Sequence, residues 1–106
     1  MSRIHRVALV GEVPPGRPCA VRVGPREVVV CNVGGRLHAI EDTCGHQGMP
    51  LSSGHLDGTT LTCAYHGWEY DVKTGRCMTD PSFHVARFAV EVRAGEVWID
   101  EDELSA

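Results

Sequence analysis

Polar and apolar residues alternate most clearly near the C-terminal end of the chain. Within the segment 88–93, a phenylalanine and two valines occupy every second position, and alanine, glutamate and arginine occupy the positions between them. A period of two is typical of a β-strand with one buried face. The turn signal Ala94-Gly95 precedes a second run, Glu96–Asp100, so the pattern predicts an antiparallel hairpin. The acidic run Ile99–Ala106 is expected to form a solvated tail.

Short valine-rich runs separated by glycine and proline predict further strands in the N-terminal half. One pair of runs is joined by a glycine-proline turn signal, and the next connection is a double glycine that predicts a hairpin. The predicted strands are Cys19–Val23, Glu27–Val33 and Arg36–Glu41, and the segment before them, Ala8–Pro18, is expected to be a loop.

No window of the sequence has a convincing helical period, so the prediction is an all-β fold of short antiparallel strands, as a sandwich or small barrel. The pattern changes over residues 43–82, where strand signals become short and loop residues dominate. We therefore expect one domain, residues 1–106, with a loop-built subdomain inserted at about residues 43–82. A chain of 106 residues suits a single domain with a small core.

Composition and charge exclude several classes of partner. The net charge is -4 and the isoelectric point is about 5.8, which argues against binding to nucleic acid, whose phosphates select clustered lysine and arginine. The apolar runs are far shorter than the ~18 residues that cross a bilayer, and the N-terminal residues have no signal-peptide pattern. We expect a cytoplasmic protein without a membrane segment.

Two of the five cysteines form mixed pairs with histidine. Cys44 and His46 belong to one pair, Cys63 and His66 to the other, and 16 residues separate the pairs. Cytoplasmic thiols stay reduced, so these side chains are expected to be metal ligands rather than parts of a disulfide framework. Two thiolates and two imidazoles suit zinc or iron. If the two loops approach each other, one iron of a [2Fe–2S] centre can take both cysteines and the other iron both histidines. A structural zinc site is the alternative.

The two pairs lie in "CGHQG" and "CAYHGW", which resemble the two boxes, Cys-x-His-x-Gly and Cys-x-x-His-Gly, of the Rieske iron–sulfur proteins. The segments "EVPPG", "PLSSG" and "YDVKTG" extend the resemblance over nearly the whole chain. It implies one [2Fe–2S] cluster, with Cys44 and Cys63 on the buried iron and His46 and His66 on the outer iron. It also implies a Rieske-like antiparallel sandwich or barrel with an inserted cluster-binding subdomain. The two box glycines are expected to let the backbone lie close to the cluster.

Three positions indicate which kind of Rieske protein the chain resembles. High-potential members carry an additional cysteine in each box, where this chain has Met49 and Tyr65, and a serine where it has Trp68. Fewer hydrogen bonds to the cluster imply a low reduction potential. Gly45 replaces the usual proline of box one, which is expected to leave that loop less rigid.

The resemblance then implies a function. The chain has no room for the catalytic domain of an oxygenase, so it is similar to the free-standing ferredoxins that carry single electrons from an NAD(P)H-dependent flavoprotein reductase to a terminal oxygenase, in catabolism of aromatic compounds. On this reading the protein is an electron carrier rather than an enzyme, and a monomer. The small Rieske subunit of an assimilatory nitrite reductase is the alternative.

The remaining polar and reactive residues are expected to have roles other than metal binding. Acidic residues near the boxes are expected to steer docking, and the other histidines to be surface or hydrogen-bonded groups. Two cysteines in strands are expected to be buried thiols, and a third, in a loop, to be exposed. Trp68 is expected to pack between loops. The acids are Glu41, Asp42, Asp57 and Glu69; the histidines are His5, His38, His55 and His84; the cysteines are Cys19, Cys31 and the loop residue Cys77.

Overall fold

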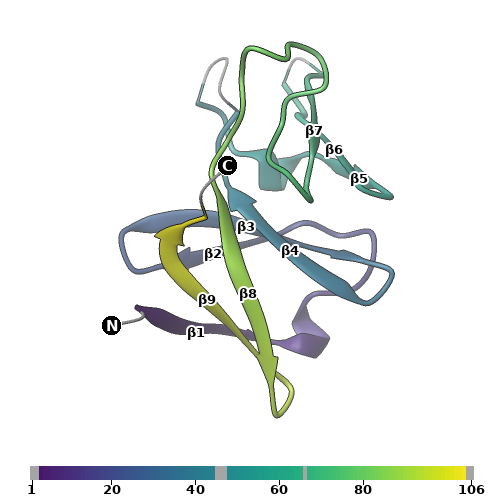
Figure 1. The fold of residues 1–106 in the computed structure, drawn as a ribbon. Coiled ribbons are helices and arrows are strands. Elements are labelled where there is room, and N and C mark those ends of the chain that lie inside the picture. Colours follow the sequence, from purple (N-terminus) through teal and green to yellow (C-terminus); the bar gives the residue numbers. More distant parts are fainter. Residues whose placement is uncertain (1–2, 45–47, 66, 105–106) are drawn as a thin grey trace.

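The structure is a computed structural model that describes residues 3–44, 48–65 and 67–104. Two antiparallel sheets make up the fold (Figure 1). The larger sheet has six strands in the order β1-β9-β8-β4-β3-β2 and curls so far that its two edge strands, β1 and β2, approach each other. Its strands are β1 (Ile4–Leu9), β2 (Cys19–Val23), β3 (Arg26–Val33), β4 (Arg36–Glu41), β8 (Arg87–Arg93) and β9 (Glu96–Glu103).

The second sheet is small and lies at one end of the first (Figure 1). Its three strands have three residues each and are paired in the order β5-β6-β7: β5 (His55–Asp57), β6 (Thr60–Thr62) and β7 (Glu69–Asp71). Two single-turn 3-10 helices, η1 (Val10–Glu12) and η2 (Leu51–Ser53), complete the elements. In the described segments, no helix has the length and apolar character needed to cross a lipid bilayer.

The predicted all-β fold is therefore confirmed, as a nearly closed barrel with an inserted subdomain. The predicted strands Cys19–Val23 and Arg36–Glu41 have the bounds that the structure gives them, and Glu27–Val33 begins one residue late. The subdomain carries β5, β6 and β7 between β4 and β8, inside the expected segment 43–82.

The prediction of a solvated C-terminal tail from Ile99 onward was wrong. Strand β9 continues to Glu103 and pairs with both β1 and β8. Glu101 is 9% exposed and accepts a hydrogen bond from the His5 ring at 2.8 Å between Nε2 and Oε1. A charged side chain tolerates burial when it is paired, and the pairing strand β1 lies almost a hundred residues away in sequence.

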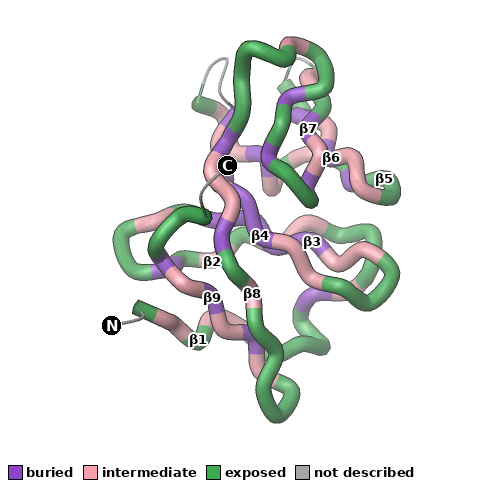
Figure 2. Tube along the Cα trace, viewed as in Figure 1, coloured by how far each residue is buried: buried purple, intermediate pink, exposed green. Residues whose placement is uncertain are grey.

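The middle of strand β3, residues 28–31, is buried (Figure 2) and contributes side chains to two separate cores. Val28 and Val30 point into the barrel core, whereas Val29 and Cys31 belong to a second core beneath the small sheet. The unbroken apolar run "VVVC" follows from this position, because a strand covered on both sides has no solvent face and loses its polar alternation. The barrel thus supplies one wall of the subdomain's core.

Candidate metal centre

The two boxes begin where strands of the two sheets end. Box one follows β4, and box two follows β6 directly. The cysteine of each box therefore lies at the start of its loop, close to a strand that is paired with an antiparallel neighbour. Cys44 is 0% exposed and Cys63 is 1% exposed, and both belong to the core beneath the small sheet. The structure therefore places the two predicted cysteine ligands in one cluster of buried residues.

The two boxes are closed by the same pair of backbone hydrogen bonds despite their different Cys–His spacing. The Cys44 amide donates to the Met49 carbonyl at 2.7 Å, and the Gly48 amide donates to the Cys44 carbonyl at 2.7 Å. The equivalent bonds in box two run from Cys63 to the Trp68 carbonyl at 2.7 Å and from the glycine four residues after Cys63 back to its carbonyl at 3.0 Å. The two loops are therefore matched: each is closed by two backbone hydrogen bonds and has a cysteine at its base.

The box glycines are required by this geometry. Gly48 has a φ of +68° and Gly67 a φ of +73°, in the left-handed region that costs other residues about 1 kcal/mol or more. Each glycine closes its loop by donating to the cysteine carbonyl four residues before it. The expectation that these glycines let the backbone lie close to the cluster stays a prediction.

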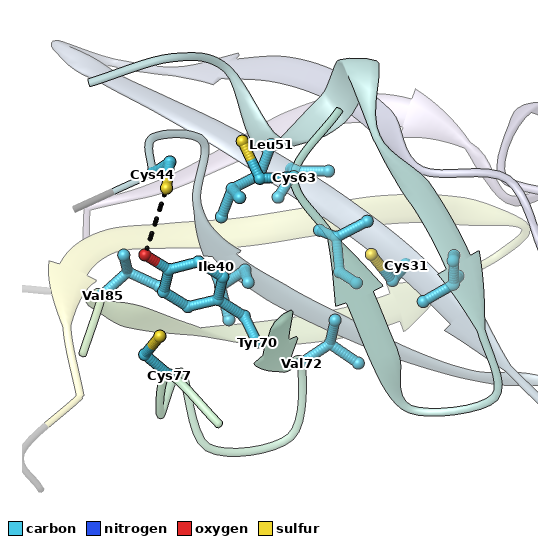
Figure 3. Packing of buried hydrophobic residues seen from close by; sticks show 12 residues of the cluster. Cys31, Ile40, Cys44, Leu51, Cys63, Tyr70, Val72, Cys77 and Val85 are labelled. Atoms are coloured by element: carbon cyan, nitrogen blue, oxygen red, sulfur yellow. Dashed lines mark hydrogen bonds between the residues drawn. The ribbon is translucent and has the colours of Figure 1, made fainter. Parts of the chain in front are cut away.

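A buried tyrosine contacts one of the predicted ligands, and sequence reasoning missed it. The Tyr70 hydroxyl lies 3.4 Å from Cys44 Sγ, and the side chain is 0% exposed (Figure 3). A metal-bound cysteine is a thiolate without a proton, so the tyrosine must be the donor in the loaded protein. The only signal in the sequence is the tyrosine of "YDVKTG", whose position in a strand beside box two does not reveal a contact with box one.

The predicted histidine ligands, His46 and His66, lie outside the described residues, as does Gly45. Among the residues that the structure does describe, no group of three or more ligating side chains surrounds a single point. The chemistry of the donor set nevertheless fits a [2Fe–2S] cluster, since two buried thiols lie at the bases of two matched loops whose next predicted donors are imidazoles.

The remaining cysteines divide between the two cores. The prediction that Cys77 is exposed was wrong: it is 0% exposed, shares the core with both predicted ligands, and its sulfur accepts the Asp80 amide at 3.4 Å. Cys31 is a buried thiol as predicted, and burial raises its pKa to about 12. Cys19 is half-buried, against the barrel core rather than inside it.

Exposed apolar side chains form a rim within and beside box two. Tyr65 is 54% exposed and Met78 is 57% exposed, and Phe83 packs against the half-buried Trp68 with ring centroids 5.3 Å apart at an interplanar angle of 64°. Packing of Trp68 between loops is therefore confirmed. The loop that carries Met78 and Phe83 is stiffened by Asp80, whose carboxylate accepts the Ser82 hydroxyl at 2.7 Å and amide at 3.0 Å, which lowers the pKa of Asp80.

Two of the four acidic residues expected to steer docking are instead engaged inside the protein. The Glu41 carboxylate accepts the Ala86 amide at 3.2 Å, and Asp42 is 9% exposed and bonded to Ser52. Asp57 and Glu69 are exposed, as expected. Of the other histidines, His55 and His84 are exposed, and partial burial beside Lys73 and Arg36 lowers the pKa of His38.

Comparison with known proteins identifies the family to which this chain belongs. The family model of the Rieske [2Fe-2S] domain matches residues 3–91, so the chain belongs to this family and carries one [2Fe–2S] cluster. The chain is 32% identical over 98 residues to the ferredoxin component of biphenyl 2,3-dioxygenase from Rhodococcus jostii (strain RHA1), covering 92% of each chain. It is 38% identical over 96 residues to ferredoxin CarAc of Metapseudomonas resinovorans, covering 89% of this chain and 90% of the relative.

Solved structures agree with these sequence relatives. A chain in the complex of reduced oxygenase and oxidised ferredoxin of carbazole 1,9a-dioxygenase matches with a TM-score of 0.90 and 33% identity, over 100% of both chains. The ferredoxin of Sphingomonas yanoikuyae B1 matches with a TM-score of 0.85 and 30% identity, over 92% of this chain and 98% of that one.

Proposed function

We propose that this protein is an electron-transfer ferredoxin that carries single electrons from an NAD(P)H-dependent flavoprotein reductase to a terminal oxygenase, in the breakdown of aromatic compounds. Relatives that align over about nine-tenths of their length are named as ferredoxin components of biphenyl and carbazole dioxygenase systems, which supports the oxygenase as the acceptor. No relative reported above is named as a nitrite reductase subunit, so that alternative is not favoured. The carrier acts as a cytoplasmic monomer made of one domain, residues 1–106.

The observation that carries the proposal is the pair of matched loops with a buried cysteine at each base. On this proposal Cys44 and Cys63 bind the inner iron, and His46 and His66 bind the outer iron. The bound cluster accepts and releases one electron without binding substrate. The chain's contribution is to hold the thiolates away from water and to donate the Tyr70 hydrogen bond to Cys44.

The apolar rim is proposed to be the surface against which the redox partners dock. Tyr65, Met78 and Phe83 are exposed beside the ligand loops, and Asp57 and Glu69 add negative charge on the same subdomain. Apolar contact stabilises a transient complex, whereas the acids accelerate encounter with a basic partner surface. Because exposed charges are screened by salt, the rate of electron transfer is expected to fall as ionic strength rises.

The cluster assignment is tested by EPR of the purified protein after anaerobic reduction with dithionite, with iron and sulfide quantified in the same sample. A rhombic Rieske signal with about two irons per chain supports the four ligands. A silent spectrum with bound zinc would refute the assignment and the electron-transfer function together.

The partner assignment needs a separate assay. Stopped-flow mixing of the reduced protein with a purified aromatic-ring dioxygenase should give rapid reoxidation of the cluster, and NADH with a flavoprotein reductase should reduce it again. The variant Glu69→Gln is expected to slow the acceptor reaction about two- to fivefold at low salt. The same charge change at Glu91, on the barrel strand β8, should leave the rate unchanged. Equal rates for all three proteins at every salt concentration would count against steering.

A further inference from the structure

We propose that Asp42 is a positioning residue for the cluster, acting through Ser52 to hold the two ligand loops in register. The proposal rests on the ligand assignment made above. Among the described residues, Asp42 and Glu101 are the two buried charged side chains, each 9% exposed. Glu101 stabilises the barrel, whereas Asp42 lies two residues before Cys44.

The Asp42 carboxylate closes the base of the first ligand loop. Its Oδ1 accepts the Ser52 amide and its Oδ2 accepts the Ser52 hydroxyl, each at 2.7 Å. Residues 42 and 52 are the two ends of the segment that contains box one, so these bonds tie its ends together. A carboxylate removed from water is costly unless its oxygens are bonded, and here each oxygen has a short, charge-assisted partner.

The same residue anchors the loop to the barrel. The Asp42 amide donates to the Glu27 carbonyl of β3 at 2.9 Å, and the preceding amide, that of Glu41, donates to the Ala86 carbonyl at 2.7 Å. The backbone at Asp42 is therefore fixed to the barrel, while Ser52 belongs to η2 of the subdomain. The two side-chain bonds thus join the rigid part of the fold to the part that carries the cluster.

Contacts continue from Ser52 to the second ligand loop. A methyl group at Gly54 would lie 1.9 Å from the Thr62 carbonyl oxygen, so the two backbones are in direct contact. The next residue, His55, pairs with Thr62 in the small sheet, and Thr62 precedes Cys63. A displacement of Ser52 therefore moves the backbone against which box two is seated.

Packing on the outer side of the first loop does not replace this tether. A cavity of about 400 Å³ separates the loop from strand β2, and its lining includes Ala20 and Arg22 on the strand and Thr43, Gly48 and Pro50 on the loop. Because side chains of the described residues do not fill this space, the polar bonds between Asp42 and Ser52 hold the loop where the described residues make no apolar contact.

The experiment compares three variants of the tether with one matched control, all as the cluster-loaded protein. Asp42→Ala removes both bonds, and Ser52→Ala removes the hydroxyl bond. Asp42→Asn retains an oxygen for the Ser52 amide, and its NH2 group can donate to the Ser52 hydroxyl oxygen, so both links remain. Glu101→Ala removes the other buried carboxylate, in the barrel. The readouts are the EPR g values and linewidths of the reduced protein, and the rate at which an iron chelator removes the cluster.

Asp42→Ala is expected to broaden the EPR signal and to accelerate iron release at least tenfold. Ser52→Ala should act in the same direction with a smaller effect, and Asp42→Asn should resemble the wild type. Glu101→Ala should lower the melting temperature of the barrel without altering the EPR signal.

Iron release and spectra for both Asp42→Ala and Ser52→Ala equal to those of Glu101→Ala would overturn the proposal. A defect in Asp42→Asn as large as that in Asp42→Ala would overturn it as well, because charge rather than the tether would then be responsible. If Asp42→Ala does not fold, Ser52→Ala decides the matter. A wild-type protein without a Rieske signal would instead refute the ligand assignment, before any variant is compared.

Discussion

The barrel and the cluster-binding subdomain are stabilised in different ways. The barrel strands have five to eight residues, and their inner faces form a core made mainly of valine, isoleucine and phenylalanine. The subdomain has three strands of three residues each, and its core contains four cysteines and Tyr70. So small a sheet is not stable alone, so the subdomain depends on the barrel wall, on loop hydrogen bonds and on the cluster.

The two regions also bury charge differently. Glu101 in the barrel is paired with His5 and lies 3.5 Å from the Arg3 guanidinium, so its partners are titratable or charged. Asp42 beside the subdomain is bonded to an amide and a hydroxyl of Ser52, which are neutral. The comparison indicates that charge pairing closes the barrel, whereas neutral donors hold the loop next to the metal site.

The largest effect is expected when the cluster is removed. Cys63→Ser should abolish cluster binding, and the small sheet should then lose hydrogen-exchange protection at Leu61 and Tyr70 by more than about a hundredfold, roughly 3 kcal/mol. Barrel amides such as those of Val30 and Ile99 should stay protected. Exchange measured by mass spectrometry on holoprotein and variant checks this, and equal loss of protection in both regions would show that they unfold as one unit.

Deleting a buried side chain from each region tests the comparison next. Ile99→Ala in the barrel and Leu61→Ala in the small sheet each remove a branched side chain that is 0% exposed. Each should cost about 2–5 kcal/mol. The barrel variant should lower the unfolding free energy measured in denaturant and retain its cluster spectrum. The subdomain variant should lose iron faster, and a barrel variant that also loses iron faster would contradict this separation.

Two glycines with similar backbone angles allow a sharper test of local packing. Gly75, at the end of the subdomain, has a φ of +80°, and Gly95, in the β8–β9 turn, has a φ of +77°. A methyl group on Gly75 would lie 2.2 Å from the Val85 carbonyl oxygen. A methyl group on Gly95 would have no described atom within 4 Å, apart from those of its two chain neighbours.

Gly95→Ala should therefore cost about 1 kcal/mol, the penalty of the left-handed conformation alone. Gly75→Ala should cost about 2 kcal/mol more, because the backbone must move to admit the methyl group. Thermal unfolding of both variants measures the difference. Equal destabilisation would show that the backbone around Val85 moves to admit the methyl group at no cost in unfolding free energy.

The smallest effect concerns the reduction potential. Tyr70→Phe removes the hydroxyl that lies 3.4 Å from Cys44 Sγ. A hydrogen bond to a thiolate ligand favours the reduced state, which carries more negative charge, so the potential should fall. The expected change is about 20–40 mV, because part of a net bond of ~1 kcal/mol distinguishes the two redox states. Protein-film voltammetry measures this change. Phe83→Leu is the control, because it leaves the contact between Tyr70 and Cys44 in place.

By itself, the sequence determined the fold class, most of the barrel strands and the two boxes. These features depend on local signals: alternation of side chains along a strand, glycine and proline in turns, and ligands spaced a few residues apart. The four ligand positions are a prediction from the two boxes, and the structure adds that Cys44 and Cys63 are buried at the bases of two matched loops.

Only the tertiary structure decided which polar residues lie inside. The sequence predicted that Glu101 lies in a solvated tail, that Cys77 is an exposed thiol and that Asp42 is a docking charge. All three side chains are buried. The contact of Tyr70 with Cys44 joins residues 26 positions apart. Each outcome depends on a partner that is distant in sequence and is brought near by the closure of the barrel and the packing of the small sheet against β3, so no local pattern could specify it.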